Sequence, residues 1–427
     1  MTPKKVYVDV ENTLAVPFLS GIQRIVKELL VRFATQPIEE IVVIPVVHCE
    51  FCRGWRQLSA SERHVLYRFR SSNSAAWDAN GWLRRTAKIA LGKRGLAILW
   101  KRWLWYQHAR HHRAQRLPRF ESGTVFLDLE ASWHNPLARD SLLPALKRSG
   151  VHVVTFHYDI IPQLFPEMTH HNTVRIFEPH LHAHLMHSDL FVCISSQVEQ
   201  DLKNYAFSRN ATRTPNTVVI QLGSDIFRTD DSDIKCPLPE GLSQFILCVG
   251  TLEPRKNPGA LLDAFDTVSS YHPDLTLVVV GRVGWDANQV VKRIKDHPLY
   301  GKRLIWLQGI DNDALDWLYK SAYLNVVPSS YEGFGLPVIE GLRRGCVTLA
   351  SNSGALPEAG RDFVEYFDLS DSDNLASMLR EYLENPGKYN DRRIQLQSYV
   401  PRSWDESAQN LLNLLRNVNG NSGSSTR

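Results

Sequence analysis

Short apolar runs alternate along this chain with longer helix-like stretches, and this alternation limits the choice of fold most strongly. In the first half the runs lie at residues 5–10, 41–47, 124–129, 151–157, 190–194 and 217–222, and in the second half at 244–249, 275–280, 304–308, 324–327, 347–350 and 363–367. This pattern predicts α/β architecture, because parallel strands need crossover helices that cover both faces of the sheet. With 427 residues the chain exceeds the size at which one core keeps growing, so we expect two domains.

A polar stretch at 223–243, which contains Cys-Pro-Leu-Pro-Glu-Gly, separates the two series of runs and is interpreted as the interdomain linker. The expected organisation is a first domain over 1–222, a second over 244–402, a C-terminal helix over 403–418 and a disordered tail over 419–427.

The composition is that of a globular protein, since 43% hydrophobic and 22% charged residues exclude a disordered profile. Six scattered cysteines indicate reduced thiols: Cys49, Cys52, Cys193, Cys236, Cys248 and Cys346. The N-terminal sequence lacks a signal-peptide pattern, and no run of 18 apolar residues occurs. We therefore expect a cytoplasmic protein without a membrane span.

The most informative motif follows the apolar run at 324–327. It reads Ser-Ser-Tyr-Glu-Gly-Phe-Gly-Leu-Pro-Val-Ile-Glu over 329–340 and opens a helix-like stretch. The backbone N–H groups of Gly333, Phe334, Gly335 and Leu336 would face an anion there, and glycines let a diphosphate approach closely. Glu332 precedes this helix and Glu340 lies inside it, so the two carboxylates can reach different parts of one ligand. An acidic helix cap alone would explain Glu332 but not the glycine-rich run.

A basic turn, Arg255-Lys256, follows the first apolar run of the second half. Arginine binds phosphate by two parallel hydrogen bonds and lysine acts as a point charge, so this turn can neutralise a diphosphate. A merely solvated turn is disfavoured because ligands of parallel sheets collect at the carboxyl ends of strands. The loop at 281–284, Gly-Arg-Val-Gly, ends the next run in the same way.

Two motifs of the first half have weaker signals. His157-Tyr158-Asp159 ends the apolar run at 151–157, where a single histidine is as often structural as functional. Gly21, in Ser-Gly-Ile-Gln-Arg over 20–24, opens the first helix-like stretch.

Together these motifs resemble glycosyltransferase family 4, whose signature is two glutamates separated by seven residues around such a glycine-rich turn. The resemblance implies the GT-B fold, in which two Rossmann-like domains face each other across a cleft, and sugar transfer with retention of anomeric configuration, without a metal or other cofactor. It implies catalytic roles for His157, Glu332, Arg255 and Lys256. The residues it implies for donor binding are Gly21, Arg255, Lys256, Gly333, Phe334, Gly335, Leu336 and Glu340.

Within this resemblance Glu332 would contact sugar hydroxyls, Glu340 the ribose, and His157 the donor sugar, while the role of Asp159 stays open because Tyr158 separates it from His157. The expected partners are a nucleotide-sugar donor and a glycan or polyprenyl-diphosphate-linked acceptor. The Gly-Ile-Gln-Arg opening is similar to that of bacterial O-antigen and exopolysaccharide mannosyltransferases, which favours GDP-mannose over UDP-sugars. A phosphorylase remains an alternative, and so does an epimerase, although the spacing of Glu332 and Glu340 argues against it. A non-catalytic sugar-nucleotide-binding subunit is a further alternative, which the presence of Arg255, Lys256 and Glu332 disfavours.

The segment 81–119 carries eleven basic residues and no acidic one, so the rest of the chain is net negative. Trp100 and Trp103 lie among these charges at near-helical spacing, which suits a helix on an anionic membrane surface, peripheral to the inner face of the plasma membrane. One alternative is a solvated insertion that packs on the domain. The other, which is less favoured, is nucleic-acid binding.

Three further patterns are interpreted as structural. Asp311-Asn-Asp313 imitates a metal-binding Asp-x-Asp but precedes a helix-like run, so Asp311 is expected to cap that helix. His180, His184 and His187 share a helical face, yet the spacing offers no carboxylate or cysteine to complete a zinc site. The pair Cys49 and Cys52 lacks a second ligand pair.

Overall fold

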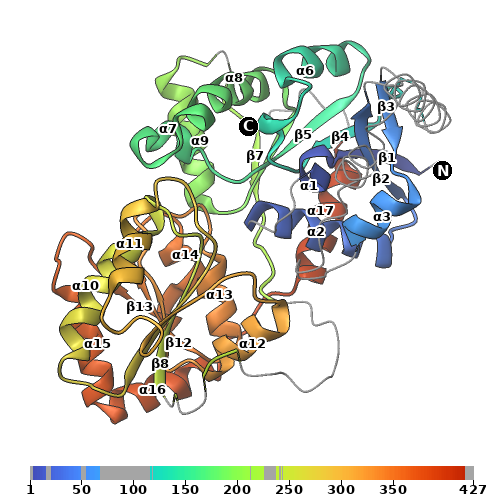
Figure 1. Cartoon of the computed structure of the whole chain (residues 1–427). Coiled ribbons are helices and arrows are strands. Elements are labelled where there is room, and N and C mark those ends of the chain that lie inside the picture. Colours follow the sequence, from blue (N-terminus) through green and yellow to red (C-terminus); the bar gives the residue numbers. More distant parts are fainter. Residues whose placement is uncertain are drawn as a thin grey trace, which may run out of the picture.

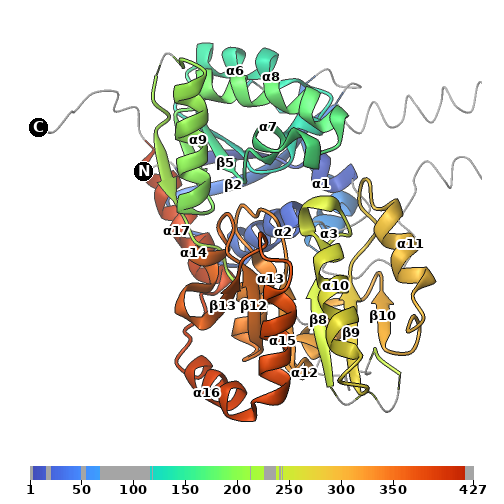
Figure 2. The ribbon, with the colours of Figure 1, turned by 90° about the vertical axis from the view of Figure 1, so that its left-hand side faces the viewer.

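The structure of the protein is a computed structural model, which describes residues 3–15, 21–49, 54–67, 116–117, 119–211, 213–225, 237–239, 242 and 244–418. These residues build two α/β units that face each other (Figures 1 and 2). The expected two-sheet α/β architecture is therefore confirmed. The basic stretch 81–115 and the tail 419–427 lie outside the described residues.

The first sheet has seven strands in the order β3-β2-β1-β4-β5-β6-β7. Its strands are β1 Lys4–Asp9, β2 Ile41–Cys49, β3 Gly54–Gln57, β4 Val125–Asp128, β5 His152–His157, β6 Leu190–Cys193 and β7 Thr217–Val219. Valine and other β-branched residues favour these extended segments. All pairs are parallel except β2 with β3, which is antiparallel. The edge strand β3 was not among the predicted runs, because Gly-Trp-Arg-Gln carries no apolar run.

Side chains alternate between the two faces of this sheet, as the period of two requires. In β1, Val6 and Val8 enter one hydrophobic cluster, while Tyr7 enters the other. The helical elements around the sheet are α1 Glu11–Ala15, α2 Gly21–Thr35, α3 Ala60–Tyr67, η1 Ser132–His134, α6 Arg139–Arg148, α7 Ile161–Leu164, η2 Pro166–Met168, α8 His171–His187 and α9 Ser196–Ser208. Both faces are thus covered, as predicted for a parallel sheet.

The second sheet has six parallel strands in the order β10-β9-β8-β11-β12-β13. They are β8 Gln244–Val249, β9 Leu275–Val280, β10 Leu304–Leu307, β11 Leu324–Val327, β12 Val347–Ser351 and β13 Val364–Phe367. The helical elements are η3 Pro254–Lys256, α10 Pro258–Ser269, α11 Asn288–Asp296, α12 Asn312–Ser321, α13 Leu336–Arg343, α14 Leu356–Gly360, η4 Arg361–Phe363, α15 Asn374–Glu384 and α16 Pro386–Leu396. The strand order reverses between β8 and β11, and ligands of open α/β sheets bind where such a reversal opens a crevice.

The chain returns to the first unit at its end. Helix α17, Trp404–Asn417, packs against α2 (Figure 1). Its Trp404, Leu411 and Leu415 belong to the hydrophobic cluster that also holds Leu29 of α2. The outgoing and returning segments touch, because a Cβ atom on Gly223 would lie 2.3 Å from the backbone nitrogen of Trp404. The chain therefore leaves the first unit and returns to it at the same place.

None of the helices among the described residues is long and apolar enough to cross a bilayer.

Candidate active site

Glu332 lies on the loop between β11 and α13, and its buried carboxylate is surrounded by donors. Arg255 Nη1 donates to Oε2 at 2.9 Å and Ser329 Oγ to Oε1 at 2.6 Å, while Lys256 Nζ pairs with Oε1. Burial raises the pKa of the Glu332 carboxyl, but Lys256 and Arg255 outweigh it and lower that pKa to about 2. Glu332 is therefore ionised at neutral pH.

The basic pair lies on η3, between β8 and α10. Arg255 Nη1 also donates to the Tyr331 carbonyl at 2.7 Å, and its Nη2 donates to Glu253 at 2.8 Å. Burial lowers the pKa of Arg255, but Glu332 and Glu253 raise it above its ordinary value. Carboxylates thus occupy the hydrogen-bond donors of Arg255 and Lys256 that a diphosphate would use.

Glycines bring the neighbouring loops close to this pair. A Cβ atom on Gly284, in the loop after β9, would lie 2.6 Å from the Leu252 carbonyl oxygen. The loops after β8 and β9 therefore lie side by side at the carboxyl edge of the second sheet, as the two motifs predicted.

The glycine-rich turn packs directly on the first unit. A Cβ atom on Gly333 would lie 2.6 Å from the Tyr158 carbonyl oxygen, and one on Gly21 would touch Leu336 at 4.0 Å. Phe334 is buried in the same cluster as the first sheet. Gly335 begins α13 with φ of 102°, a conformation that favours glycine. The turn therefore joins both units.

Glu340 lies on α13 and is almost completely buried. Its Oε1 pairs with Arg24 of α2, and its Oε2 accepts from Tyr319 Oη at 3.0 Å. Burial lowers the pKa of Arg24, but Glu340 raises it above its ordinary value. Both partners were missed by the sequence analysis, although Arg24 belongs to the motif that contains Gly21.

His157 and Asp159 come from the carboxyl end of β5. Burial, aided by nearby His184, lowers the pKa of His157 to about 3, so its imidazole is neutral at physiological pH. Within the described part of the chain its Nε2 has no hydrogen-bond partner. Burial raises the pKa of Asp159 and Arg255 opposes that shift, which places this first-unit carboxylate within electrostatic reach of the basic pair.

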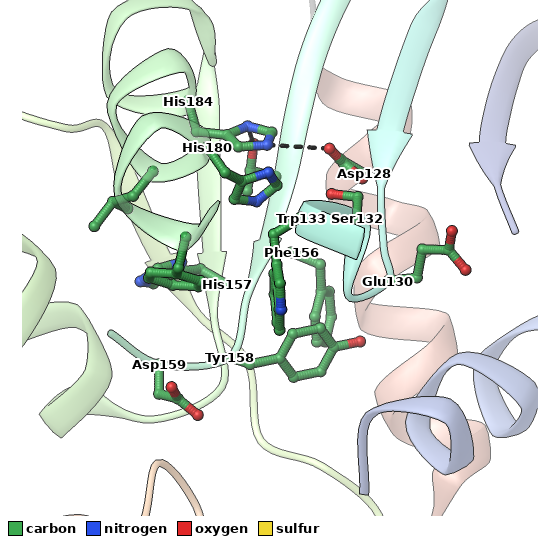
Figure 3. A pocket seen from close by; sticks show the side chains of 13 residues that line it. Asp128, Glu130, Ser132, Trp133, Phe156, His157, Tyr158, Asp159, His180 and His184 are labelled. Atoms are coloured by element: carbon green, nitrogen blue, oxygen red, sulfur yellow. Dashed lines mark hydrogen bonds and ion pairs between the residues drawn. The ribbon is translucent and has the colours of Figure 1, made fainter. Parts of the chain in front are cut away.

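A cavity of about 20 Å³ lies beside His157, between the β5 loop, η1 and α8 (Figure 3). Trp133, His180 and His184 line it together with Asp128. Such a volume holds about one water molecule. The cavity is too small for a sugar ring in this arrangement of the chain.

Asp128 supplies the carboxylate that sequence spacing did not offer to the histidines of α8. His184 Nε2 lies 3.0 Å from Asp128 Oδ2, and its Nδ1 lies 2.7 Å from Thr155 Oγ1 (Figure 3). Among the described residues no group of His, Cys, Asp and Glu side chains has metal-binding geometry. The sequence spacing could not show this contact, because the fold brings Asp128 at the end of β4 to His184 of α8.

Arg139 ties the ends of two strands together beneath this cavity. Its Nη2 donates to Asp9 at 2.7 Å and its Nε to Asp128 at 2.6 Å, and all three side chains are buried. The signal available in the sequence was the position of both aspartates at the carboxyl ends of β1 and β4.

Asp311 is the N-cap of α12, as predicted, because its carboxylate accepts from the Ala314 N–H at 2.8 Å.

Residues 233–397 match the family described as Glycosyl transferases group 1. The serotype-specific mannosyltransferase WbdA of Escherichia coli is 26% identical over 289 residues, which are 63% of this chain and 34% of that protein. The O-antigen chain mannosyltransferase B of Escherichia coli is 29% identical over 246 residues, 55% of this chain and 61% of that protein. The chain thus spans about a third of the length of WbdA.

Solved structures resemble the whole chain at low identity. Sucrose-phosphate synthase from Thermosynechococcus elongatus has a TM-score of 0.59 at 16% identity and covers 97% of this chain and 98% of its own. HepE from Anabaena, in complex with UDP and glucose, has a TM-score of 0.58 at 16% identity, with 96% of this chain and 99% of its own covered. The chain therefore has the GT-B fold of these solved structures, and its residues 233–397 are similar to the group 1 glycosyltransferases.

Proposed function

We propose that this protein transfers a mannosyl group from GDP-mannose to a glycan or polyprenyl-diphosphate-linked acceptor in the synthesis of a bacterial surface polysaccharide. The observation that carries the proposal is the cluster of Glu332, Arg255 and Lys256, which faces Asp159 of the other unit. The mannosyltransferase names of WbdA and of O-antigen chain mannosyltransferase B support mannose as the donor sugar.

The diphosphate of the donor would take over the contacts that Arg255 and Lys256 make with carboxylates. Its negative charge grows as the bond from the anomeric carbon to the phosphate oxygen breaks, so fixed cations stabilise the transition state more than the ground state. A metal ion is dispensable under this proposal because these two side chains and the start of α13 supply the positive charge.

Glu332, released by the diphosphate from its cations, would accept hydrogen bonds from hydroxyls of the sugar. Glu340 would bind the ribose once Arg24 leaves it. His157 is neutral, so it would serve as a hydrogen-bonding partner of the sugar rather than as a cation.

Transfer would proceed on one face of the sugar. The acceptor oxygen bonds to the anomeric carbon, the phosphate oxygen departs, and the acceptor proton passes to that phosphate oxygen. Asp159 does not act as the nucleophile in this proposal, and its Oδ1 accepts the backbone N–H of Ile161 at 3.0 Å. Retention of the anomeric configuration follows.

A panel of ligands tests the donor. The melting temperature should rise with GDP-mannose and GDP more than with UDP-glucose and UDP, because only the preferred nucleotide binds tightly to the folded state. HepE was crystallised with UDP, so a UDP-sugar is the alternative donor, and a larger rise with UDP compounds would replace GDP-mannose by it. Release of GDP from GDP-mannose by the purified protein distinguishes an enzyme from a non-catalytic binding subunit.

The basic segment 81–119 remains a proposed membrane contact. Lysine and arginine side chains near an anionic surface each add about 1 kcal/mol of attraction, and the tryptophans suit the headgroup region. A lipid-linked acceptor would then reach the first unit from the cytoplasmic face of the membrane.

A further inference from the structure

Helix α9 of the first unit and its N-cap Ser195 make several polar contacts with the second unit. Ser195 Oγ donates to the Gly333 carbonyl at 2.7 Å, and Tyr331 Oη donates to the Asp201 carboxylate. The Glu358 carboxylate of α14 accepts the Ser196 N–H at 2.8 and 2.9 Å from its two oxygens. We call this set the interdomain clamp: Ser195, Ser196, Asp201, Tyr331, Gly333 and Glu358.

Ser195, Asp201 and Tyr331 of the clamp are buried, whereas the contact between Ser196 and Glu358 is exposed. Ser195 is 0%, Asp201 8% and Tyr331 9% exposed. A buried polar group that loses its partner keeps its desolvation cost, so separating these groups requires water to enter or the units to part. Glu358 in addition places a negative charge at the N-terminus of α9, where unpaired backbone N–H groups favour it.

The clamp holds both neighbours of Glu332 in the sequence. Tyr331 and Gly333 are each fixed to α9, and the Glu332 carbonyl accepts the Ala355 N–H at 2.9 Å. Gly354 has φ of 56°, and a Cβ atom there would lie 2.5 Å from the Glu332 carbonyl oxygen. The turn that supports the backbone of Glu332 therefore continues directly into α14, which carries Glu358.

The same contacts bring the two halves of the site together. A Cβ atom on Gly333 would meet not only the Tyr158 carbonyl but also Asp159 Cβ, at 3.1 Å. Arg255 and Lys256 stay with Glu332 on the second unit whether or not the units are closed. The contacts with α9 hold Gly333 beside the loop of His157 and Asp159.

We propose that α9 is the docking element of the donor-binding loop, and that Ser195, Asp201, Tyr331 and Glu358 are positioning residues that align Glu332 with the His157 loop for transfer. This proposal rests on the proposed transferase function. The side chains of the clamp residues do not contact Arg255 or Lys256, the cations that would bind the diphosphate. The clamp residues therefore affect the turnover rate, while nucleotide affinity depends on the second unit.

The test compares Tyr331→Phe, Asp201→Ala and Glu358→Ala with wild type. Each should lower kcat for GDP release from GDP-mannose by about tenfold, while the Kd of GDP changes less than about twofold, because alignment rather than donor contact is lost. Asp201→Asn, which still accepts a hydrogen bond from Tyr331, should restore most of the turnover. The double variant Asp201→Ala/Tyr331→Phe should be no slower than the slower single variant.

Two control variants are matched to these changes. Tyr323→Phe removes a hydroxyl that donates to the Tyr382 carbonyl within the second unit, and Glu178→Ala removes an exposed carboxylate that pairs with Arg209 within the first. Both should keep the wild-type kcat. If Tyr331→Phe and Glu358→Ala keep it as well, or if they weaken GDP binding as much as they slow turnover, the positioning role is wrong.

Small-angle scattering of the donor-free protein tests the clamp without an activity assay. The radius of gyration should increase in Asp201→Ala/Glu358→Ala and stay unchanged in the two controls. An unchanged radius of gyration in the double variant overturns the clamp, regardless of the measured activity. An increased radius in a protein that releases no nucleoside diphosphate from any nucleotide-sugar retains the clamp and overturns the proposed function.

Discussion

Arg24 of the first unit and Glu340 of the second form a buried ion pair across the interface, and Tyr319 donates to the other carboxylate oxygen of Glu340. A nucleotide whose ribose binds Glu340 must therefore displace a guanidinium from it. Removing one partner of a buried pair leaves the other charge desolvated and unpaired, so the exchange couples nucleotide binding to the contact between α2 and α13.

The first prediction separates the two glutamates. Glu340→Gln should weaken GDP binding by about tenfold or more, because it removes a charged acceptor from the ribose site. Glu332→Gln should instead lower kcat strongly with a smaller effect on GDP affinity. Titration calorimetry and steady-state kinetics on both variants decide this, with exposed Glu384→Gln as the control. Equal GDP affinities in the two variants would show that the division of roles is wrong.

The second prediction concerns the acid stability of the fold. The pKa of His157 falls to about 3 in the folded protein, from an ordinary value of 6.5. Between these values the unfolded chain binds more protons, so stability rises with pH and the destabilisation grows as the pH falls from 6.5 towards 3.

His157→Gln should remove that contribution. Urea unfolding at pH 7 and pH 5 should show a loss of stability on acidification that is smaller in the variant by about 1–2 kcal/mol. His182→Gln, at an exposed position on α8, is the control and should keep the wild-type pH dependence. A His157 variant with the full wild-type pH dependence would contradict the neutral, buried imidazole.

The third prediction uses Gly354, whose positive φ and close approach to Glu332 exclude a side chain. Gly354→Ala should destabilise the protein by roughly 2–4 kcal/mol, since strain and overpacking add. Gly301→Ala is the matched control, because its φ of 75° imposes the strain but no atom lies within 4 Å of the new methyl group. Similar melting temperatures for the two variants would remove the argument that this turn supports Glu332.

The fourth prediction concerns the basic segment. Wild-type protein should sediment with anionic vesicles at low salt and less at high salt, because salt screens the attraction. Trp100→Ser/Trp103→Ser and Lys101→Glu/Arg102→Glu should both reduce binding and transfer to a lipid-linked acceptor. Absence of wild-type binding at every salt concentration, or full activity of both variants, would rule the membrane contact out.

The sequence predicted those parts of the fold that have a local signal. Each buried parallel strand appeared as an apolar run, and Glu332, Arg255 and His157 lie at the ends of such runs, so their positions at strand ends could be expected. The edge strand β3 has no such run and was missed. The contact of Tyr331 with Asp201 joins residues 130 positions apart, and nothing in either neighbourhood predicts it.

The sequence also could not predict which unit the C-terminal helix packs on. The amphipathic pattern of α17 predicts a helix with one apolar face, but the same face could pack on either sheet. Its packing on α2 depends on the return of the chain beside Gly223, a tertiary relationship.

The central claim is that Arg255 and Lys256 stabilise the departing diphosphate of a nucleotide-sugar. Its most direct test is the kcat/KM of GDP release from GDP-mannose, with UDP-glucose assayed in parallel, for Arg255→Ala, Lys256→Ala and the exposed control Lys320→Ala. Each of the first two variants should lose about 2–4 kcal/mol of transition-state stabilisation with the better donor, while remaining folded, and the control should match wild type. Near wild-type kcat/KM in both Arg255→Ala and Lys256→Ala would contradict the account.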